Sequence, residues 1–296
     1  MVINVSGSIS AINKVRKSLK NLSPIVQNGL ELHITSGKSS VDLTHSQNEI
    51  NIGLINQDAT DEFYQKLNGL SDSLAITLVD NGSGDSLPEL ITNSNLITRV
   101  LGLQIHCFKG VQIELSEDRI FRLNKIRTNP DISEIVLRTS DIAVFNMNAI
   151  RRADQCGNIK ANTTGLTIEE ACQIAKFIGA SDLIDNIFFA GINVNDDLHE
   201  MMSINVANLI WYINEGATMR NLDRDISNTE NLVFSVVAEP LEQELQFVKS
   251  TDSGRWWVKV PTEEGHMHMA CSKRDYEKAC NNEISDRISK ALKTVV

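Results

Sequence analysis

The chain has 296 residues, of which 42% are hydrophobic and 22% charged, and its formal net charge is −10. This composition allows a substantial globular core, and the acidic excess argues against general binding to nucleic acid or anionic membranes. No apolar run reaches the length of a membrane span and no secretory signal opens the sequence, so we expect a cytoplasmic protein without membrane insertion. The five scattered cysteines are expected to be thiols in a reducing compartment.

Strand-like and helix-like segments alternate along most of the chain. The N-terminus, MVINVSGSISAINKVRKSLK, reads as a short strand followed by a basic amphipathic helix. Further strands are expected at 30–35, 49–55, 74–79, 104–107, 142–147 and 186–190. Helices are expected at 59–70, 94–101, 115–124, 131–137, 167–179 and 199–212. This alternation predicts an α/β fold with three layers (α/β/α) around a mostly parallel sheet.

The last part of the chain has a different pattern. Short strands are expected at 231–237, 246–248 and 255–260, and residues 273–292 read as mostly helical. His266 and His268 share one face if they lie on a strand, but they stand near no carboxylate or cysteine pattern that would complete a metal site.

In parallel sheets of this class, ligands bind outside the carboxyl ends of the strands. Three loops therefore matter: those after Val79, after Met147 and after Ala190. The second follows the segment VFNMNAI, which carries Asn146 and Asn148 two positions apart. Two carboxylates at this spacing could grip a divalent metal, whereas carboxamides have the same shape without the charge. The alternative is that both amides only hydrogen-bond within the strand-end loop.

Several segments, taken in order, resemble the ureohydrolase superfamily of arginase, agmatinase and formimidoylglutamase, in particular its arginase-like Bacteroidetes branch. The segments that carry the resemblance are GLINQDAT (53–60), LAITLVDNGSGD (74–85), DIAVFNMNAIRRAD (141–154), NTTGLTIEEACQIAKFIG (162–179), FFAGINVND (188–196), KSTDSGRWWVKVP (249–261) and ACSKRDYEKACNNEISDR (270–287). The resemblance implies one arginase-like domain over residues 1–296, shortened at its N-terminus, with a branch-specific tail from about 245 to 296.

The resemblance also implies where a binuclear manganese site would lie. The family's metal ligands fall at Gln57, Asp80, Gly82, Gly84, Asn146 and Asn148, and its substrate-binding glutamate falls at Gly191. Only Asp80 keeps a strong ligand, although a shift of one residue would bring in Asp85. Two manganese ions would thus meet one or two carboxylates, too few to offset their charge. We therefore expect no manganese and no catalytic residue.

Three functional hypotheses follow. The first is a ureohydrolase-fold pseudoenzyme that acts as a structural or protein-binding component, with a protein partner or a second copy of itself. The second is a divergent hydrolase of linear amidines or guanidines, with a metal relocated to Asp80, Asp85, Asp154 and a histidine. The third is a small-molecule sensor whose pocket is lined by Asn146, Asn148 and Asn193.

A further candidate is the run Arg255, Trp256 and Trp257, which follows a Ser-Gly turn. Adjacent strand residues face opposite sides, so one indole should enter the core and the other should lie on a surface or interface. Arginine and tryptophan are enriched at binding hot spots, which makes an interface the alternative to simple packing.

Overall fold

The computed structural model describes residues 2–22, 31–36, 49–70, 73–108, 118–155, 158, 160–193, 200–223, 226–227, 231–238, 243–263 and 265–293. The chain divides into two compact units, Met1–Thr218 and Met219–Val296. The sequence predicted one domain with a tail from about 245. The division between the two units lies earlier, after Thr218, and the residues that follow it have a hydrophobic core of their own.

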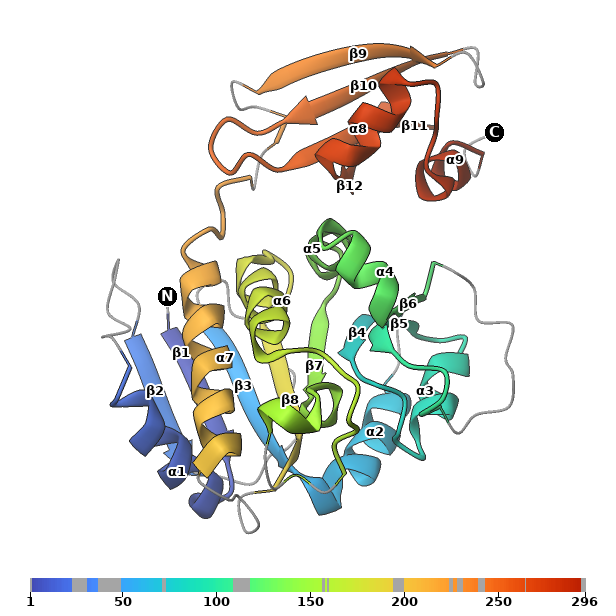
Figure 1. Ribbon diagram of the computed structural model, residues 1–296. Helices are drawn as coiled ribbons and strands as arrows, with labels where there is room; N and C mark the ends of the chain where they lie inside the picture. Colours follow the sequence, from blue (N-terminus) through green and yellow to red (C-terminus); the bar gives the residue numbers. More distant parts are fainter. Residues whose placement is uncertain are drawn as a thin grey trace. The chain divides into compact units, whose positions relative to one another are not determined.

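Within its described residues, the first unit is built on an eight-stranded sheet in the order β2-β1-β3-β8-β7-β4-β5-β6 (Figure 1). All of its strand pairs are parallel. The strands are β1 (Val2–Gly7), β2 (Glu31–Ser36), β3 (Glu49–Asn56), β4 (Ala75–Val79), β5 (Ile97–Leu103), β6 (Ile120–Arg122), β7 (Ile142–Asn146) and β8 (Asn186–Ile192). The predicted α/β class with a parallel sheet is confirmed.

The central strands are apolar without interruption because both faces of the sheet are covered. Every residue of β4, β7 and β8 is buried. Alternate side chains enter two separate cores: Phe145 and Phe189 belong to one, and Val144 and Phe188 to the other. The sheet is therefore the middle of three layers.

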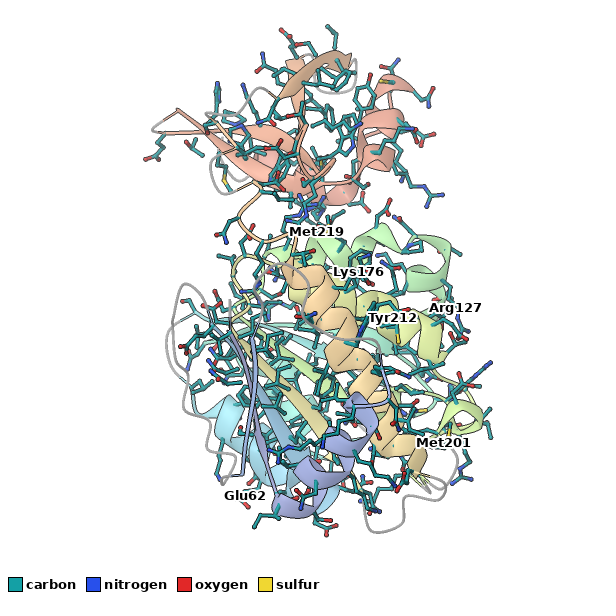
Figure 2. The ribbon with its side chains drawn as sticks, turned by 90° about the vertical axis from the view of Figure 1, so that its left-hand side faces the viewer. Glu62, Arg127, Lys176, Met201, Tyr212 and Met219 are labelled. Carbon is teal, nitrogen blue, oxygen red and sulfur yellow. The ribbon has the colours of Figure 1, made fainter. Side chains whose placement is uncertain are left out.

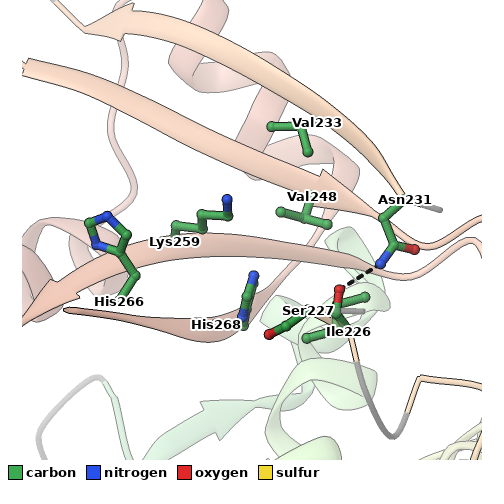
Figure 3. A pocket seen from close by; sticks show the side chains of 8 residues that line it. All are labelled: Ile226, Ser227, Asn231, Val233, Val248, Lys259, His266 and His268. Carbon is green, nitrogen blue, oxygen red and sulfur yellow. Dashed lines mark hydrogen bonds between the residues drawn. The ribbon is translucent and has the colours of Figure 1, made fainter. Parts of the chain in front are cut away.

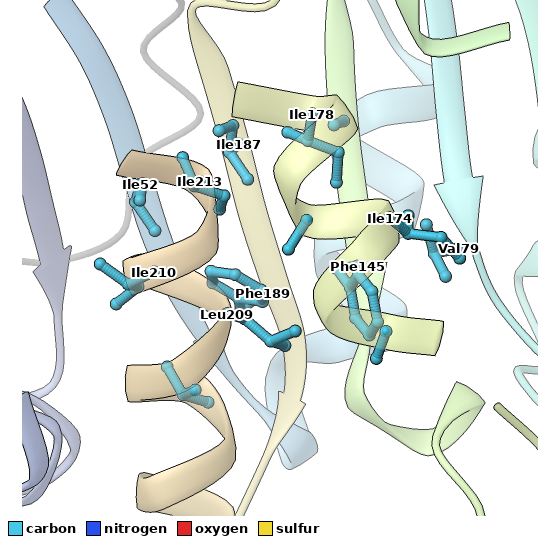
Figure 4. Packing of buried hydrophobic residues seen from close by; sticks show 14 of the residues in the cluster. Ile52, Val79, Phe145, Ile174, Ile178, Ile187, Phe189, Leu209, Ile210 and Ile213 are labelled. Atoms are coloured by element: carbon cyan, nitrogen blue, oxygen red, sulfur yellow. The ribbon is translucent and has the colours of Figure 1, made fainter. Parts of the chain in front are cut away.

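Helices from both sides supply the outer layers. The first core contains residues of α1 (Ile9–Leu19), α4 (Leu123–Thr128), α5 (Asp131–Arg138), α6 (Ile168–Ala180) and α7 (Met201–Ala217). The second contains residues of α2 (Thr60–Asn68) and α3 (Leu87–Thr92). Thr167 begins α6 with a capping box that Glu170 completes. Figure 4 shows α6 and α7 lying over the strands, with Ile178 and Ile213 among the side chains between them.

In its described residues, the second unit has an antiparallel sheet of four strands in the order β12-β11-β10-β9. Its elements are β9 (Leu232–Ala238), β10 (Gln243–Lys249), β11 (Trp256–Thr262), β12 (Gly265–Cys271), α8 (Lys273–Cys280) and α9 (Asp286–Lys293). Residues of both helices join one face of the sheet in a third core. The expected strands and helical tail are present here, and β12 is an addition.

Three predicted elements are wrong in type. Residues 94–101 were expected to form a helix, but 97–103 form β5, because this β-branched segment pairs with β4 and β6 inside the sheet. Residues 104–107 form a turn rather than a strand, closed by the Cys107 amide donating to the Gln104 carbonyl at 2.9 Å. In the segment predicted as a helix at 115–124, residues 120–122 form β6, and 115–117 lie outside the described residues.

The described cysteines are free thiols, as expected from their scattered positions. No disulfide joins Cys107, Cys172, Cys271 or Cys280, and Cys156 lies outside the described residues. None of the helices in the described part of the chain combines the length and hydropathy that crossing a bilayer requires.

Helices α6 and α7 approach so closely that each needs a glycine where they meet. A Cβ added at Gly179 would lie 2.0 Å from the Ile213 carbonyl oxygen, and one added at Gly216 would lie 2.0 Å from that of Lys176. Lys176 also forms an ion pair with Glu215 at 3.0 Å; Figure 2 shows Lys176 beside α7.

We predict that Gly179→Ala destabilises the protein by about 2 kcal/mol or more, because the added methyl forces the two helix backbones apart. The matched control is Gly69→Ala, whose Cβ would meet the Lys66 carbonyl oxygen at an ordinary 3.5 Å. Urea unfolding of the full chain measures both variants. Equal midpoints for the two variants would contradict the close contact.

Candidate functional site

The carboxyl ends of β4, β7 and β8 lie side by side in the middle of the sheet, since β7 pairs with both of the others. Asp80 directly follows β4, Asn146 is the last residue of β7, and Gly191 is the last but one of β8. Sequence reasoning placed these three positions at one edge, and the structure brings them together there.

The carboxylate of Asp80 is fully buried and accepts three hydrogen bonds. Its Oδ2 accepts from the Tyr64 hydroxyl at 2.7 Å and from the Asn146 amide Nδ2 at 2.7 Å. Its Oδ1 accepts from the Gly82 backbone N–H at 2.7 Å. Tyr64 and Asp80 are 0% exposed and Asn146 is 1% exposed, so protein groups occupy the surroundings of this carboxylate.

Burial and hydrogen bonding act on Asp80 in opposite directions. Burial raises the pKa of Asp80 above its ordinary value, while the hydrogen bonds from Gly82, Tyr64 and Asn146 partly offset this. The pKa of the Tyr64 phenol is raised well above its ordinary value, first by burial and then by the neighbouring carboxylate. Tyr64 therefore stays a hydrogen-bond donor at physiological pH.

A second set of hydrogen bonds ties the neighbouring loops together. Asn146 Oδ1 accepts from the Asn148 backbone N–H at 3.0 Å, and the Asn148 carbonyl accepts from Asn81 Nδ2 at 2.8 Å. Asn148 Oδ1 accepts from Asn158 Nδ2 at 3.0 Å, and the same nitrogen donates to Gln155 Oε1 at 2.7 Å. The amides thus join the loop after β4 to the loop after β7.

Gly191 brings the backbone of β8 against these amides. Its φ is +76°, and an added Cβ would lie 2.8 Å from Asn146 Oδ1 and 3.5 Å from Asn148 Nδ2. Its N–H donates to Thr60 Oγ1 at 3.1 Å, at the start of α2. Both the conformation and the close approach require glycine here.

The other positions singled out in the sequence lie around this cluster. Gln57 is half-buried in a short 3-10 helix (Gln57–Ala59) after β3. Gly82 has φ +95°, and its added Cβ would lie 2.8 Å from a Leu103 methyl. Gly84 lies beside the Tyr64 ring, which an added Cβ would approach to 3.7 Å. Asp85 is exposed, and Asn193 is half-buried after the end of β8.

Asp80 and Asp154, two of the carboxylates that a relocated metal would need, accept hydrogen bonds from different groups. Asp154 Oδ2 accepts from Arg151 Nε at 2.9 Å and from the Ile168 backbone N–H at 3.0 Å, at the start of α6. Asp80 is held by Tyr64, Asn146 and Gly82. Within the described ranges, no three His, Cys, Asp or Glu side chains form a group that could hold a metal.

Sequence reasoning missed Tyr64, the residue that completes the cluster. It lies on the buried face of α2, together with Phe63 and Leu67, and its spacing is that of a core residue. A buried tyrosine hydroxyl nevertheless needs a polar partner. That requirement, combined with the position of α2 after the β3 strand end, is the signal that could have found it.

Arg255, Trp256 and Trp257 are all buried in the structure. Trp256 stacks between Phe234 and Tyr276, with ring centroids 5.2 and 5.1 Å away. This indole enters the third core, as predicted for one of the two. The expectation that the other indole lies on a surface is wrong, because Trp257 is only 7% exposed. The guanidinium of Arg255 lies 3.5 Å from the Asp223 carboxylate. An interface role for the run stays a prediction.

The first comparisons, with sequence collections, are negative: no protein-family model and no curated protein matches the chain. Solved structures do match. Formiminoglutamase from Trypanosoma cruzi superimposes with a TM-score of 0.58 at 10% identity, covering 74% of this chain and 93% of that one. Formimidoylglutamase from Bacillus subtilis gives 0.55 at 15%, covering 74% and 87%. Agmatine ureohydrolase from Thermoplasma volcanium gives 0.53 at 14%, covering 74% and 89%.

These comparisons show a fold. The chain has the arginase-like architecture of ureohydrolases at very low sequence identity. The resemblance read from the sequence segments is confirmed at that level, while the Bacteroidetes branch stays a prediction.

We predict that Tyr64→Phe destabilises the protein by about 1–3 kcal/mol, because Asp80 loses a hydrogen bond inside a buried site. Tyr212→Phe, which removes a hydroxyl from a half-buried position on α7, is the control. Urea unfolding at pH 7 compares the two. A loss for Tyr64→Phe no larger than that of the control would show that the hydroxyl contributes nothing special.

We predict that Asn146→Asp destabilises the protein at pH 8 by about 3 kcal/mol, because a second carboxylate then faces Asp80 in a buried site. Burial and like charge raise the pKa of this pair in the folded state. The protonated pair is therefore tolerated at low pH, and stability is lost as the pH rises through the raised pKa.

Unfolding free energies at pH 5 and pH 8 test the sign of this effect. The difference from the unmodified protein should be smaller at pH 5. Asn124→Asp adds the same charge at an exposed position on α4 and should change stability little at either pH. A difference for Asn146→Asp that grows toward low pH would refute the like-charge explanation.

Proposed function

We propose that this chain is a ureohydrolase-fold protein without hydrolase activity, which serves as a structural or protein-binding component. The observation that carries the proposal is the state of Asp80. Both oxygens of this buried carboxylate are used by Tyr64, Asn146 and Gly82. A fully buried carboxylate whose two oxygens both accept hydrogen bonds from protein donors acts as a structural group rather than as an exposed ligand for a metal.

The residues at the positions matched to the family's metal site support the same proposal. The Trypanosoma cruzi relative was solved with manganese. In this chain, the positions matched to a binuclear site are Gln57, Asp80, Gly82, Gly84, Asn146 and Asn148, of which only Asp80 is charged. Two divalent ions would bring four positive charges to one carboxylate, a cost of several kcal/mol per ion. These residues do not fit the manganese pair.

The amide groups argue against the two alternative functions. Asn146 uses its nitrogen toward Asp80 and its oxygen toward the Asn148 N–H, so neither atom points to a vacant pocket, as the sensor hypothesis needs. Asp154 accepts hydrogen bonds from Arg151 and from the start of α6, none of which is a partner of Asp80, and this weakens the hypothesis of a relocated metal.

The scaffold itself supports a structural role. The hydrogen bonds that replace a ligand join β4, β7, β8 and α2, so the sheet edge is stabilised without any bound group. We propose that the partner is a protein, either another chain or a second copy. The net charge of −10 makes nucleic acid and anionic membrane poor partners.

Metal analysis and an activity assay test this proposal together. The full chain, equilibrated with excess MnCl2 and then dialysed, should retain substoichiometric manganese. It should not hydrolyse arginine, agmatine or formimidoylglutamate. The Bacillus subtilis formimidoylglutamase, treated in parallel, is the positive control. Two manganese ions per chain together with hydrolysis of any of these compounds would refute the pseudoenzyme assignment.

A further inference from the structure

The second unit has a hollow on the face of its sheet opposite α8 and α9. The core beneath the helices takes Phe247, Val258 and Cys271, so their strand neighbours project to the other face. There, a cavity of about 300 Å³ is lined by Ile226, Ser227, Asn231, Val233, Val248, Lys259, His266 and His268 (Figure 3).

The lining joins a basic side to an apolar side. Lys259 on β11 is the register partner of His268 on β12, and His266 lies two residues before His268 on the same face. Val233 on β9 pairs with Val248 on β10 and forms the apolar side together with Ile226. Among the residues that the structure describes, the lining contains no carboxylate, in a chain whose net charge is −10.

The basic groups act on one another. The pKa of His268 is lowered, first by burial and then by the positive charges of Lys259 and His266. Lys259 Nζ donates to Gln246 Oε1 at 3.1 Å, which holds the ammonium over the sheet face. Among the described residues of this face, Glu244 is the carboxylate on β10, exposed and outside the lining; β9 contributes no charged side chain.

We infer that this hollow binds a small ligand that carries a carboxylate or phosphate group on a short apolar body. The anionic group would accept a charge-assisted hydrogen bond from Lys259 and further hydrogen bonds from the imidazoles of His266 and His268. The apolar body would lie over Val233 and Val248. A bound anion offsets the burial and the positive charge that lower the pKa of His268, so binding favours the protonated imidazole of His268 and should strengthen as the pH falls from 8 to 6.

Nuclear magnetic resonance of the histidine imidazoles in the full chain tests the inference. The probes are inorganic phosphate, which supplies the anion alone, and hexanoate, which supplies a carboxylate with an apolar chain. We expect saturable shifts of His266 and His268 with at least one probe, and tighter binding at pH 6 than at pH 8. Saturation by phosphate alone assigns the site to phosphate carriers, and tighter binding of hexanoate assigns it to carboxylates.

Variants separate a built site from general charge attraction. Lys259→Gln and His268→Gln should each weaken binding about tenfold, the effect of losing one charge-assisted contact. Lys278→Gln removes an equal charge from an exposed position on α8 and should leave binding unchanged. Circular dichroism verifies that each variant is folded. The inference is overturned if neither probe gives saturable shifts, or if Lys278→Gln weakens binding as much as Lys259→Gln.

Discussion

The hydrogen bonds that Tyr64 and Asn146 donate to Asp80 are the contact on which the sheet edge of the first unit depends. Asp80 is fully buried at the end of β4, where an uncompensated charge would cost several kcal/mol. Each donor comes from a different element, so satisfying the carboxylate also ties α2 and β7 to β4. The surrounding asparagines extend the same principle: Asn81 joins the loop after β4 to the loop after β7, and the side-chain amides of Asn146 and Asn158 hold Asn148 within the second loop.

This arrangement explains how a fold shared with a formiminoglutamase that was solved with manganese can hold this sheet edge together through protein hydrogen bonds. In a metal site, carboxylates converge and the ion holds the strand ends together. Here one carboxylate meets neutral donors, and their hydrogen bonds hold the strand ends together. Catalysis and stability at this edge can therefore be separated, and we propose that the chain has kept only the second.

The features that could be predicted from the sequence are those set by the pattern of neighbouring residues along the chain. The continuous apolar runs at 142–146 and 186–192 predict strands buried on both faces, and strand-end topology places Asp80 near Asn146. The strand at 97–103 was missed because its apolar residues also match helical spacing, and only pairing with β4 and β6 decides. Tyr64 was missed because helix periodicity identifies a buried face but not the partner of a hydroxyl. The boundary after Thr218 has no marker as clear as a proline- or glycine-rich linker.

Gly191 limits which substitutions this sheet edge can accept. Its backbone fills the space beside Asn146, where any side chain would collide with the amide oxygen. A larger residue at 191 requires Asn146 to move first, and Asn146 is committed to Asp80. A side chain at position 191 therefore depends on a prior change at position 146. We therefore expect positions 146 and 191 to vary together in related chains, since the size of the residue at one limits the choice at the other.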